Sequence, residues 1–247
     1  MKSATAFFTV SWQKMIRNIK HRGLSKSFVH LKRQLSLRMK YRYLDLWGNT
    51  GQDLFGTNGR DGENATPAVN MHNYRFESTK PFVFKEVFRN LEWNFNESTF
   101  IDFGSGKGAG LVYASAYHFK KLIGVEISQQ LCDIAGQNMK IFTSRSKHKI
   151  DYEVVHTDAG EYQIPPESDC FYFFNPFDAT ILEQVIKNIL ASLEKKSRKI
   201  LIIYINALHN EVMKKYSFKE IKCISADLLD VYLDDYKIYI YTNPENS

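Results

Sequence analysis

The first 44 residues of this 247-residue sequence contain no aspartate or glutamate, although they hold 11 of its 33 lysine and arginine residues. The remaining residues carry 22 basic side chains against all 27 acidic ones, a net charge of −5, whereas the whole chain has a net charge of +6. Positive charge is therefore concentrated in the N-terminal part, and the rest of the protein is mildly acidic. We expect an anionic partner to meet residues 1–44 first.

Cysteine is scarce, and long apolar runs are missing. Cys132, Cys170 and Cys223 are widely spaced, without the C-x-x-C pairs of a zinc site or the density of a disulfide scaffold. No apolar run approaches the 18 to 20 residues of a membrane span, and the start, MKSATAFFTV, has too short an apolar core for a signal peptide. The sequence therefore predicts a cytoplasmic protein with no transmembrane segment, disulfide framework or metal site.

Apolar residues recur at helical spacing over residues 12–19 and again over 28–39, with basic residues on the other sides. This pattern predicts two basic amphipathic helices, whose apolar faces pack on the body or which bind a membrane, a nucleic acid or an acidic protein. Residues 46–68 follow neither the helix nor the strand period and predict a long, glycine-rich loop. We therefore expect a basic helical arm with this loop over residues 1–69 and a catalytic domain over 70–247.

The stretch FIDFGSGKGAG, residues 100–110, predicts a strand, a tight turn and the start of a helix. Glycine at alternate positions permits positive φ and lets a ligand approach the backbone closely. Gly104, Gly106 and Ala109 satisfy the dinucleotide fingerprint, and Glu126 follows about 20 residues on, as that fingerprint expects. Asp102 favours a ligand that bears an ammonium group, such as S-adenosylmethionine, over a pyrophosphate.

Short apolar runs alternate with helical patterns after the glycine turn. Strands are expected at residues 121–125, 152–156, 170–174 and 200–205, and helices at 82–91, 109–118, 128–141 and 181–193, with Ser128 as an N-cap. The last two apolar runs, 218–225 and 236–242, are joined by too few residues for a crossover helix and predict an antiparallel pair. The expected fold is α/β, a Rossmann-like, seven-stranded, mostly parallel sheet with a C-terminal antiparallel hairpin.

With these pieces in place, the chain resembles the class I, seven-strand S-adenosylmethionine-dependent methyltransferases over roughly residues 70–245. The pieces that carry the resemblance are FIDFGSGKGAG, GVEIS, HTDAGEY and FFNPF, each at a predicted strand end. With YRFEST ahead of them, the layout is similar to the non-SET histone lysine methyltransferases, and the N-P-F signature is similar to that of bacterial methyltransferases. The chain departs from the histone enzymes in Pro176, which replaces a second asparagine, and in one extra residue in the YRFEST loop.

The resemblance implies a set of residues that bind S-adenosyl-L-methionine. Asp102 and the turn would hold the methionine moiety, Glu126 would accept hydrogen bonds from the ribose, and Asp158 would accept from the adenine amine. Thr79, together with Glu77, lies in the loop that the resemblance places over the cofactor. The implied turn residues are Gly104, Ser105, Gly106 and Gly108.

Methyl transfer from a sulfonium is an in-line displacement, which needs alignment and exclusion of water more than acid-base groups. The side-chain and backbone carbonyls of Asn175 suit an amine acceptor, Pro176 adds no competing N–H donor, and Phe177 offers an apolar wall. Glu77 would meet the ammonium of the cofactor or deprotonate the substrate, or it caps the next helix. Tyr204 either lines the substrate side or packs in the sheet.

These observations predict an S-adenosylmethionine-dependent methyltransferase that methylates an amine nitrogen of a protein or a small molecule. Two alternatives stay open at this point. One is a catalytically weak methyltransferase-fold module that binds an anionic partner through residues 1–44. The other is a NAD-dependent oxidoreductase, which the glycine fingerprint alone would also permit.

Overall fold

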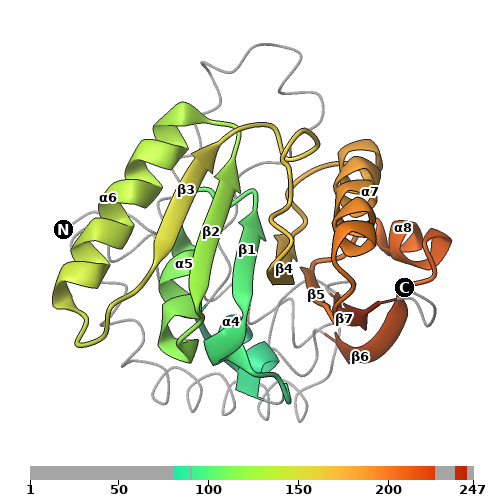
Figure 1. Cartoon of the computed structure of the whole chain (residues 1–247), viewed down its shortest axis with the longest axis horizontal. Helices are drawn as coiled ribbons and strands as arrows, with labels where there is room; N and C mark the ends of the chain where they lie inside the picture. Colours follow the sequence, from blue (N-terminus) through green and yellow to red (C-terminus); the bar gives the residue numbers. More distant parts are fainter. Residues whose placement is uncertain (1–80, 90, 226–236, 244–247) are drawn as a thin grey trace, which may run out of the picture. The chain divides into compact units, whose positions relative to one another are not determined.

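The computed structural model describes residues 81–89, 91–225 and 237–243. The predicted basic helices, the glycine-rich loop and the domain boundary at residue 69 lie outside these residues. In the described part, a helix follows each of the strands β1, β2, β4 and β5, whereas β4 follows β3 without a helix between them (Figure 1). The helices are α4 (Pro81–Arg89), α5 (Ala109–Ala114), α6 (Gln129–Arg145), α7 (Ala179–Lys195) and α8 (Asn210–Lys215).

The strands form one seven-stranded sheet in the order β3-β2-β1-β4-β5-β7-β6. Strands β1 to β5 are parallel, and β7 runs antiparallel to both β5 and β6. This arrangement confirms the predicted fold, including the antiparallel pair at the end of the sequence. The strand bounds are β1 Thr99–Phe103, β2 Lys121–Glu126, β3 Tyr152–His156, β4 Ser168–Phe174, β5 Leu201–Ile205, β6 Lys219–Ser225 and β7 Lys237–Thr242.

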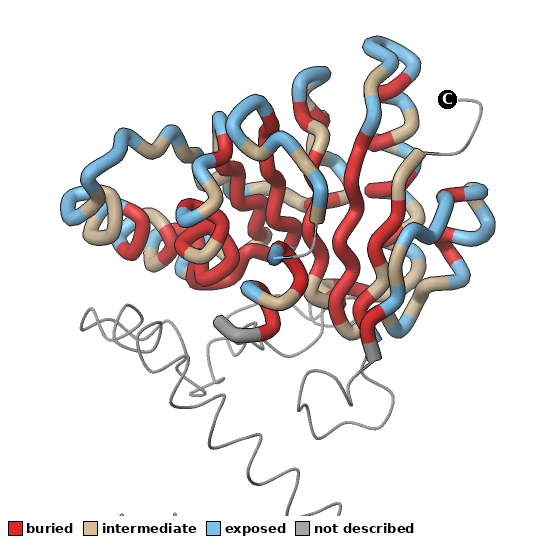
Figure 2. The backbone as a smooth tube through the Cα atoms, turned by 90° about the horizontal axis from the view of Figure 1, so that it is seen from below, coloured by how far each residue is buried: buried red, intermediate tan, exposed pale blue. Residues whose placement is uncertain are grey.

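Helices cover both faces of the sheet, and each face has its own apolar core. Side chains from α4, α5 and α6 pack on one face, and side chains from α7 and α8 pack on the other. The central strands β1, β4 and β5 are buried along most of their length, as Figure 2 shows. A strand buried on both faces explains the continuous apolar runs in the sequence. Because strands β1 to β5 are parallel, their carboxyl ends meet along one edge of the sheet. Open α/β sheets bind their ligands outside this edge.

Aromatic rings fill the core on the α4 side. The rings of Phe84 and Phe88, one helical turn apart, are stacked with centroids 4.2 Å apart. Tyr117 lies 4.8 Å from Phe88, and Phe100 of β1 lies 6.3 Å from both α4 rings. This aromatic cluster holds α4 on the face of the sheet that also carries α5.

Helix boundaries follow local capping. Ser128 is the N-cap of α6, because its Oγ accepts a hydrogen bond from Leu131 N at 3.4 Å, as predicted. Asp178 caps α7 by accepting from Thr180 N and Ile181 N, so that helix begins two residues earlier than the apolar pattern suggested. Helix α8 was not predicted from the sequence.

Arg198 ties the end of α7 to the start of β4. Its guanidinium donates to Ser168 O at 2.7 Å, Ser192 O at 3.0 Å, Lys196 O at 2.9 Å and Ser192 Oγ at 2.8 Å. Lysine keeps the charge but not the planar fork of donors, so we expect Arg198→Lys to lower the free energy of unfolding by about 1–3 kcal/mol.

Urea denaturation measures this loss. If only stability changes, the slope of the free energy of unfolding against urea concentration stays the same. Arg145→Lys at the exposed end of α6 is the matched control and should change stability by less than about 0.5 kcal/mol. Equal effects in the two variants would mean that the guanidinium network contributes nothing specific.

Across residues 81–89, 91–225 and 237–243, no helix is long and apolar enough to cross a membrane. The expectation of an anionic partner for residues 1–44 falls outside the described residues.

Candidate active site

The glycine turn, residues 104–108, connects β1 to α5 at the carboxyl edge of the sheet. Its glycines have positive φ, +71° at Gly104, +53° at Gly106 and +80° at Gly108, a conformation that other residues adopt at a cost. Strand β2 fixes the turn, because Gly104 N and Ser105 N both donate to Val125 O, at 2.8 and 3.1 Å. The sequence therefore predicted both the place and the backbone conformation of this turn.

Glu126 closes the turn from the end of β2. One carboxylate oxygen, Oε2, accepts from Gly106 N at 2.9 Å, and the other, Oε1, accepts from Ser128 N at 3.0 Å. Burial raises the pKa of this carboxyl group, and backbone donors at Ser128, Gly106 and Ile127 oppose the rise. A carboxylate has about four acceptor positions, so Glu126 can still accept a hydrogen bond from a diol.

Asp102 is the second buried carboxyl group, with only 4% of its surface exposed. Burial, and then the charge of Glu126, raise its pKa to about 8. The side chain lies against Gly110 of α5, where a Cβ atom would collide with Oδ2. Two carboxyl groups therefore lie behind one glycine turn, an arrangement suited to a cationic ligand.

The N-P-F segment lies directly against the glycine turn. A Cβ atom at Gly104 would collide with the Cβ atom of Pro176, so glycine is required there by space as well as by φ. Asn175 follows β4 with φ of +41°, is 7% exposed, and accepts a hydrogen bond at Oδ1 from the Tyr204 hydroxyl at 3.3 Å. The ring of Phe177 is 4% exposed and packs in the core, at an edge-to-face angle to Phe173.

Asp158 lies two residues beyond the end of β3, the strand that pairs with β2 and so lies beside the end of β2 at Glu126. Its Oδ1 accepts from Gly160 N at 2.7 Å, which makes a turn stabilised by the carboxylate. This bond is compatible with the predicted adenine contact, because Asp158 keeps its other oxygen. The proposed contact stays a prediction.

The hydroxyl of Ser105 is buried beneath the turn, without a hydrogen-bond partner in the described part of the chain. A Cβ atom at Gly124 of β2 would lie 2.8 Å from it, so Ser105 Oγ faces the sheet. A contact between Ser105 and the cofactor would therefore use its backbone. Glu77 and Thr79 lie outside the described residues, so their predicted roles stay predictions.

Two supports of the turn were missed in the sequence. Asn138, buried in the middle of α6, donates from Nδ2 to Lys107 O at 2.9 Å. Gly124 provides the space that Ser105 occupies. The sequence offered one indication of the role of Asn138, an amide side chain on the apolar face of a predicted helix. Buried polar side chains need hydrogen-bond partners, so such a residue is expected to bind a neighbouring segment.

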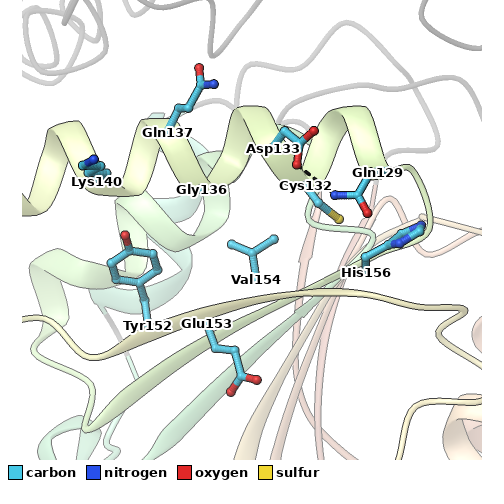
Figure 3. A pocket seen from close by; sticks show the side chains of 10 residues that line it. All are labelled: Gln129, Cys132, Asp133, Gly136, Gln137, Lys140, Tyr152, Glu153, Val154 and His156. Carbon is cyan, nitrogen blue, oxygen red and sulfur yellow. Dashed lines mark hydrogen bonds between the residues drawn. The ribbon is translucent and has the colours of Figure 1, made fainter.

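A groove of about 570 Å³ runs between α6 and the edge strand β3 (Figure 3), and no residue of the glycine turn lines it. Its lining is mixed, with the charged or polar side chains of Asp133 and Lys140 from α6 and of Glu153 and His156 from β3 among apolar surface. His156 Nε2 lies 2.9 Å from Ile127 O, so one end of the groove adjoins the segment after Glu126.

The turn does not suit a pyrophosphate. A phosphate site at a helix N-terminus depends on backbone N–H groups that point at the ligand. Here the N–H groups of Gly104, Ser105, Gly106 and Gly108 all donate to protein oxygens. The geometry therefore weighs against the NAD-dependent alternative.

The sheet order, the antiparallel β7 and the acidic glycine turn define a class I, Rossmann-like methyltransferase. The chain belongs to the family described as histone methylation protein DOT1, whose model matches residues 71–230. It is therefore a S-adenosylmethionine-dependent methyltransferase.

Solved structures share the fold at low sequence identity. The chain is similar to the yhhF protein of Escherichia coli, whose description names a methyltransferase, with a TM-score of 0.52, 14% identity, and coverage of 68% of this chain and 89% of that one. It is also similar to a SAM-dependent methyltransferase from Aquifex aeolicus, with a TM-score of 0.48, 11% identity, and coverage of 67% of this chain and 98% of that one. No curated protein sequence matches the chain significantly.

Proposed function

We propose that this methyltransferase methylates an amine nitrogen, and that the acceptor is a lysine side chain of a protein. The observation that carries the proposal is the direct packing of Pro176 on Gly104, which brings the N-P-F segment to the glycine turn. The family description, histone methylation protein DOT1, supports a protein acceptor over a small molecule.

The residues at the turn fit S-adenosylmethionine. When bound, the cofactor supplies a methyl group on a positively charged sulfur, next to a methionine ammonium and a ribose diol. Gly106 has positive φ and no side chain, so a ligand can approach the backbone of the turn closely at this residue. We assign the ammonium side to Asp102, the diol to Glu126 and the adenine amine to Asp158. Ser105 and Gly108 would contribute backbone carbonyl groups, because their N–H groups already donate within the protein.

The N-P-F segment then orients the acceptor. A lysine amine attacks only in its neutral form, with its lone pair directed at the methyl carbon. Carbonyl groups at Asn175 accept the remaining amine hydrogens, and Pro176 offers no competing N–H donor. Alignment of this kind alone accounts for large rate effects. We assign to Glu77 the separate step of removing the proton that keeps the acceptor amine charged.

Replacing Asn175 with alanine tests the assignment. We expect Asn175→Ala to lower the rate of labelled-methyl transfer by about 100-fold, because misplacement of the acceptor by about 1 Å has effects of this size. The affinity for S-adenosylmethionine, measured by calorimetry, should stay within about threefold, because Asn175 is assigned to the acceptor.

Asn206 provides the matched control. It follows β5 as Asn175 follows β4, with φ of +51°, so Asn206→Ala introduces a similar backbone strain. The assay supplies labelled cofactor to purified histones, to fractionated cell protein and to a small-molecule fraction. Label in the small-molecule fraction alone would overturn the protein acceptor, and equal rates for parent and Asn175→Ala would overturn the role of Asn175.

A further inference from the structure

The hydroxyl of Tyr204 links strand β5 to the N-P-F segment. Tyr204 lies opposite Phe173 of β4 in the parallel register, and its side chain is fully buried. Its hydroxyl donates to Asn175 Oδ1 at 3.3 Å and accepts from the backbone N–H of His209 at 3.4 Å. These contacts join the segment after β5 to the segment after β4 at the same edge of the sheet.

The ring of Tyr204 alone would fill the core at this position. It packs edge to face on Phe173, with ring centroids 6.0 Å apart. A buried hydroxyl is unfavourable unless it is hydrogen-bonded, and here its partners lie toward the glycine turn rather than in the core. The polar atom of Tyr204 therefore contributes something that a phenylalanine would not.

What it contributes is the orientation of Asn175. The backbone of Asn175 is left-handed, with φ of +41°. Residues other than glycine adopt this conformation at a cost in free energy, so the surrounding contacts must hold it in place. The hydrogen bond from Tyr204 uses one lone pair of Asn175 Oδ1 and fixes the side-chain amide. The second lone pair of Oδ1 and the backbone carbonyl of Asn175 then have fixed directions relative to Pro176, which packs on Gly104.

We infer that Tyr204 is a positioning residue for methyl transfer, and that it acts through the amide of Asn175. This inference rests on the proposed function, in which the segment after β4 orients the acceptor amine. Tyr204 touches neither the cofactor nor the acceptor in this scheme. It holds the segment that does.

Tyr204→Phe removes one oxygen and keeps the ring. We expect it to lower the turnover of methyl transfer about five- to tenfold, the effect of losing one hydrogen bond, with little change in KM or in affinity for S-adenosylmethionine. In the Asn175→Ala background the same substitution should have no further effect, because the contact is already gone. Equal effects in both backgrounds would overturn the inference.

Tyr241→Phe is the matched control. Tyr241 lies in β7 in the same core, and its buried hydroxyl has no hydrogen-bond partner in the described part of the chain. A loss of turnover as large as that of Tyr204→Phe would indicate a general effect of removing core hydroxyls.

A second measurement does not depend on finding the acceptor. The side-chain amide signals of Asn175 in ¹H–¹⁵N NMR spectra, assigned with the Asn175→Ala variant, should move in Tyr204→Phe and stay in place in Tyr241→Phe. Unmoved signals in Tyr204→Phe would overturn the inference whatever the activity. Moved signals without methyl transfer by the parent would leave the contact standing and overturn the proposed function.

Discussion

Replacing Asp102 with asparagine is expected to stabilise the cofactor-free protein above neutral pH. The carboxyl group is buried behind the glycine turn, and its pKa is raised to about 8 from an ordinary value of 3.8. The folded protein therefore binds this proton more tightly than the unfolded chain does. Stability falls as the pH rises from about 4 to about 8, because folding then requires either a buried charge or a bound proton.

Asparagine has no proton to lose, so Asp102→Asn should lack this fall. At about 1.4 kcal/mol per pKa unit, the variant should exceed the parent by roughly 3–6 kcal/mol at pH 9 and by no more than about 2 kcal/mol at pH 5. Urea denaturation at the two pH values measures the difference. Parallel pH profiles for parent and variant would contradict a raised pKa at Asp102.

The same substitution should weaken cofactor binding. Loss of the carboxylate that we assign to the ammonium group of the cofactor should lower affinity by about 100-fold, the effect of removing one partner of a buried charge pair. The parent should bind S-adenosylmethionine more tightly as the pH rises toward 8, because binding then needs less work to ionise Asp102. Calorimetry at several pH values tests both expectations.

Asp169→Asn is the matched control for cofactor binding. Burial also raises the pKa of Asp169, but this residue lies at the start of β4, where it accepts from Ser98 Oγ and Thr99 N. It is therefore at the opposite end of the strand from the N-P-F segment. Its substitution should leave cofactor affinity unchanged, and an equal loss of affinity would mean that Asp102 has no specific role.

Gly104→Ala is expected to destabilise the protein and to disrupt the site. Alanine at φ of +71° is strained, and its Cβ atom would collide with Pro176. Strain contributes about 1–2 kcal/mol and overpacking about 1–3 kcal/mol, so we expect a loss of roughly 2–5 kcal/mol in the free energy of unfolding. Cofactor affinity should fall as well, because the turn and the N-P-F segment must move apart.

Gly136 offers a control with the opposite sign. It lies within α6, and a Cβ atom there would meet nothing within 4 Å. Gly136→Ala should therefore stabilise the protein by about 0.5–1 kcal/mol. Adding Pro176→Gly to Gly104→Ala should recover the part of the loss that comes from the collision, and a double variant as unstable as Gly104→Ala would assign the whole effect to φ.

Much of the fold was determined by patterns within a few residues of one another. Alternating apolar runs and helical periods predicted the parallel strands, the antiparallel end and the N-cap at Ser128. Glycine at 104, 106 and 108 predicted a turn with positive φ, and the strand ends placed Glu126 and Asn175 at one edge. Each of these follows from steric and capping preferences that act locally along the chain.

The tertiary structure decided what surrounds those residues. The raised pKa of Asp102 depends on burial, and the use of the turn N–H groups depends on Val125 and Glu126 of the neighbouring strand. The hydrogen bond from Tyr204 to Asn175 joins residues 29 positions apart, through the register of β4 and β5. The sequence by itself determined a glycine turn and its acidic neighbours, whereas strand register and packing decided which atoms of that turn stay available to a ligand.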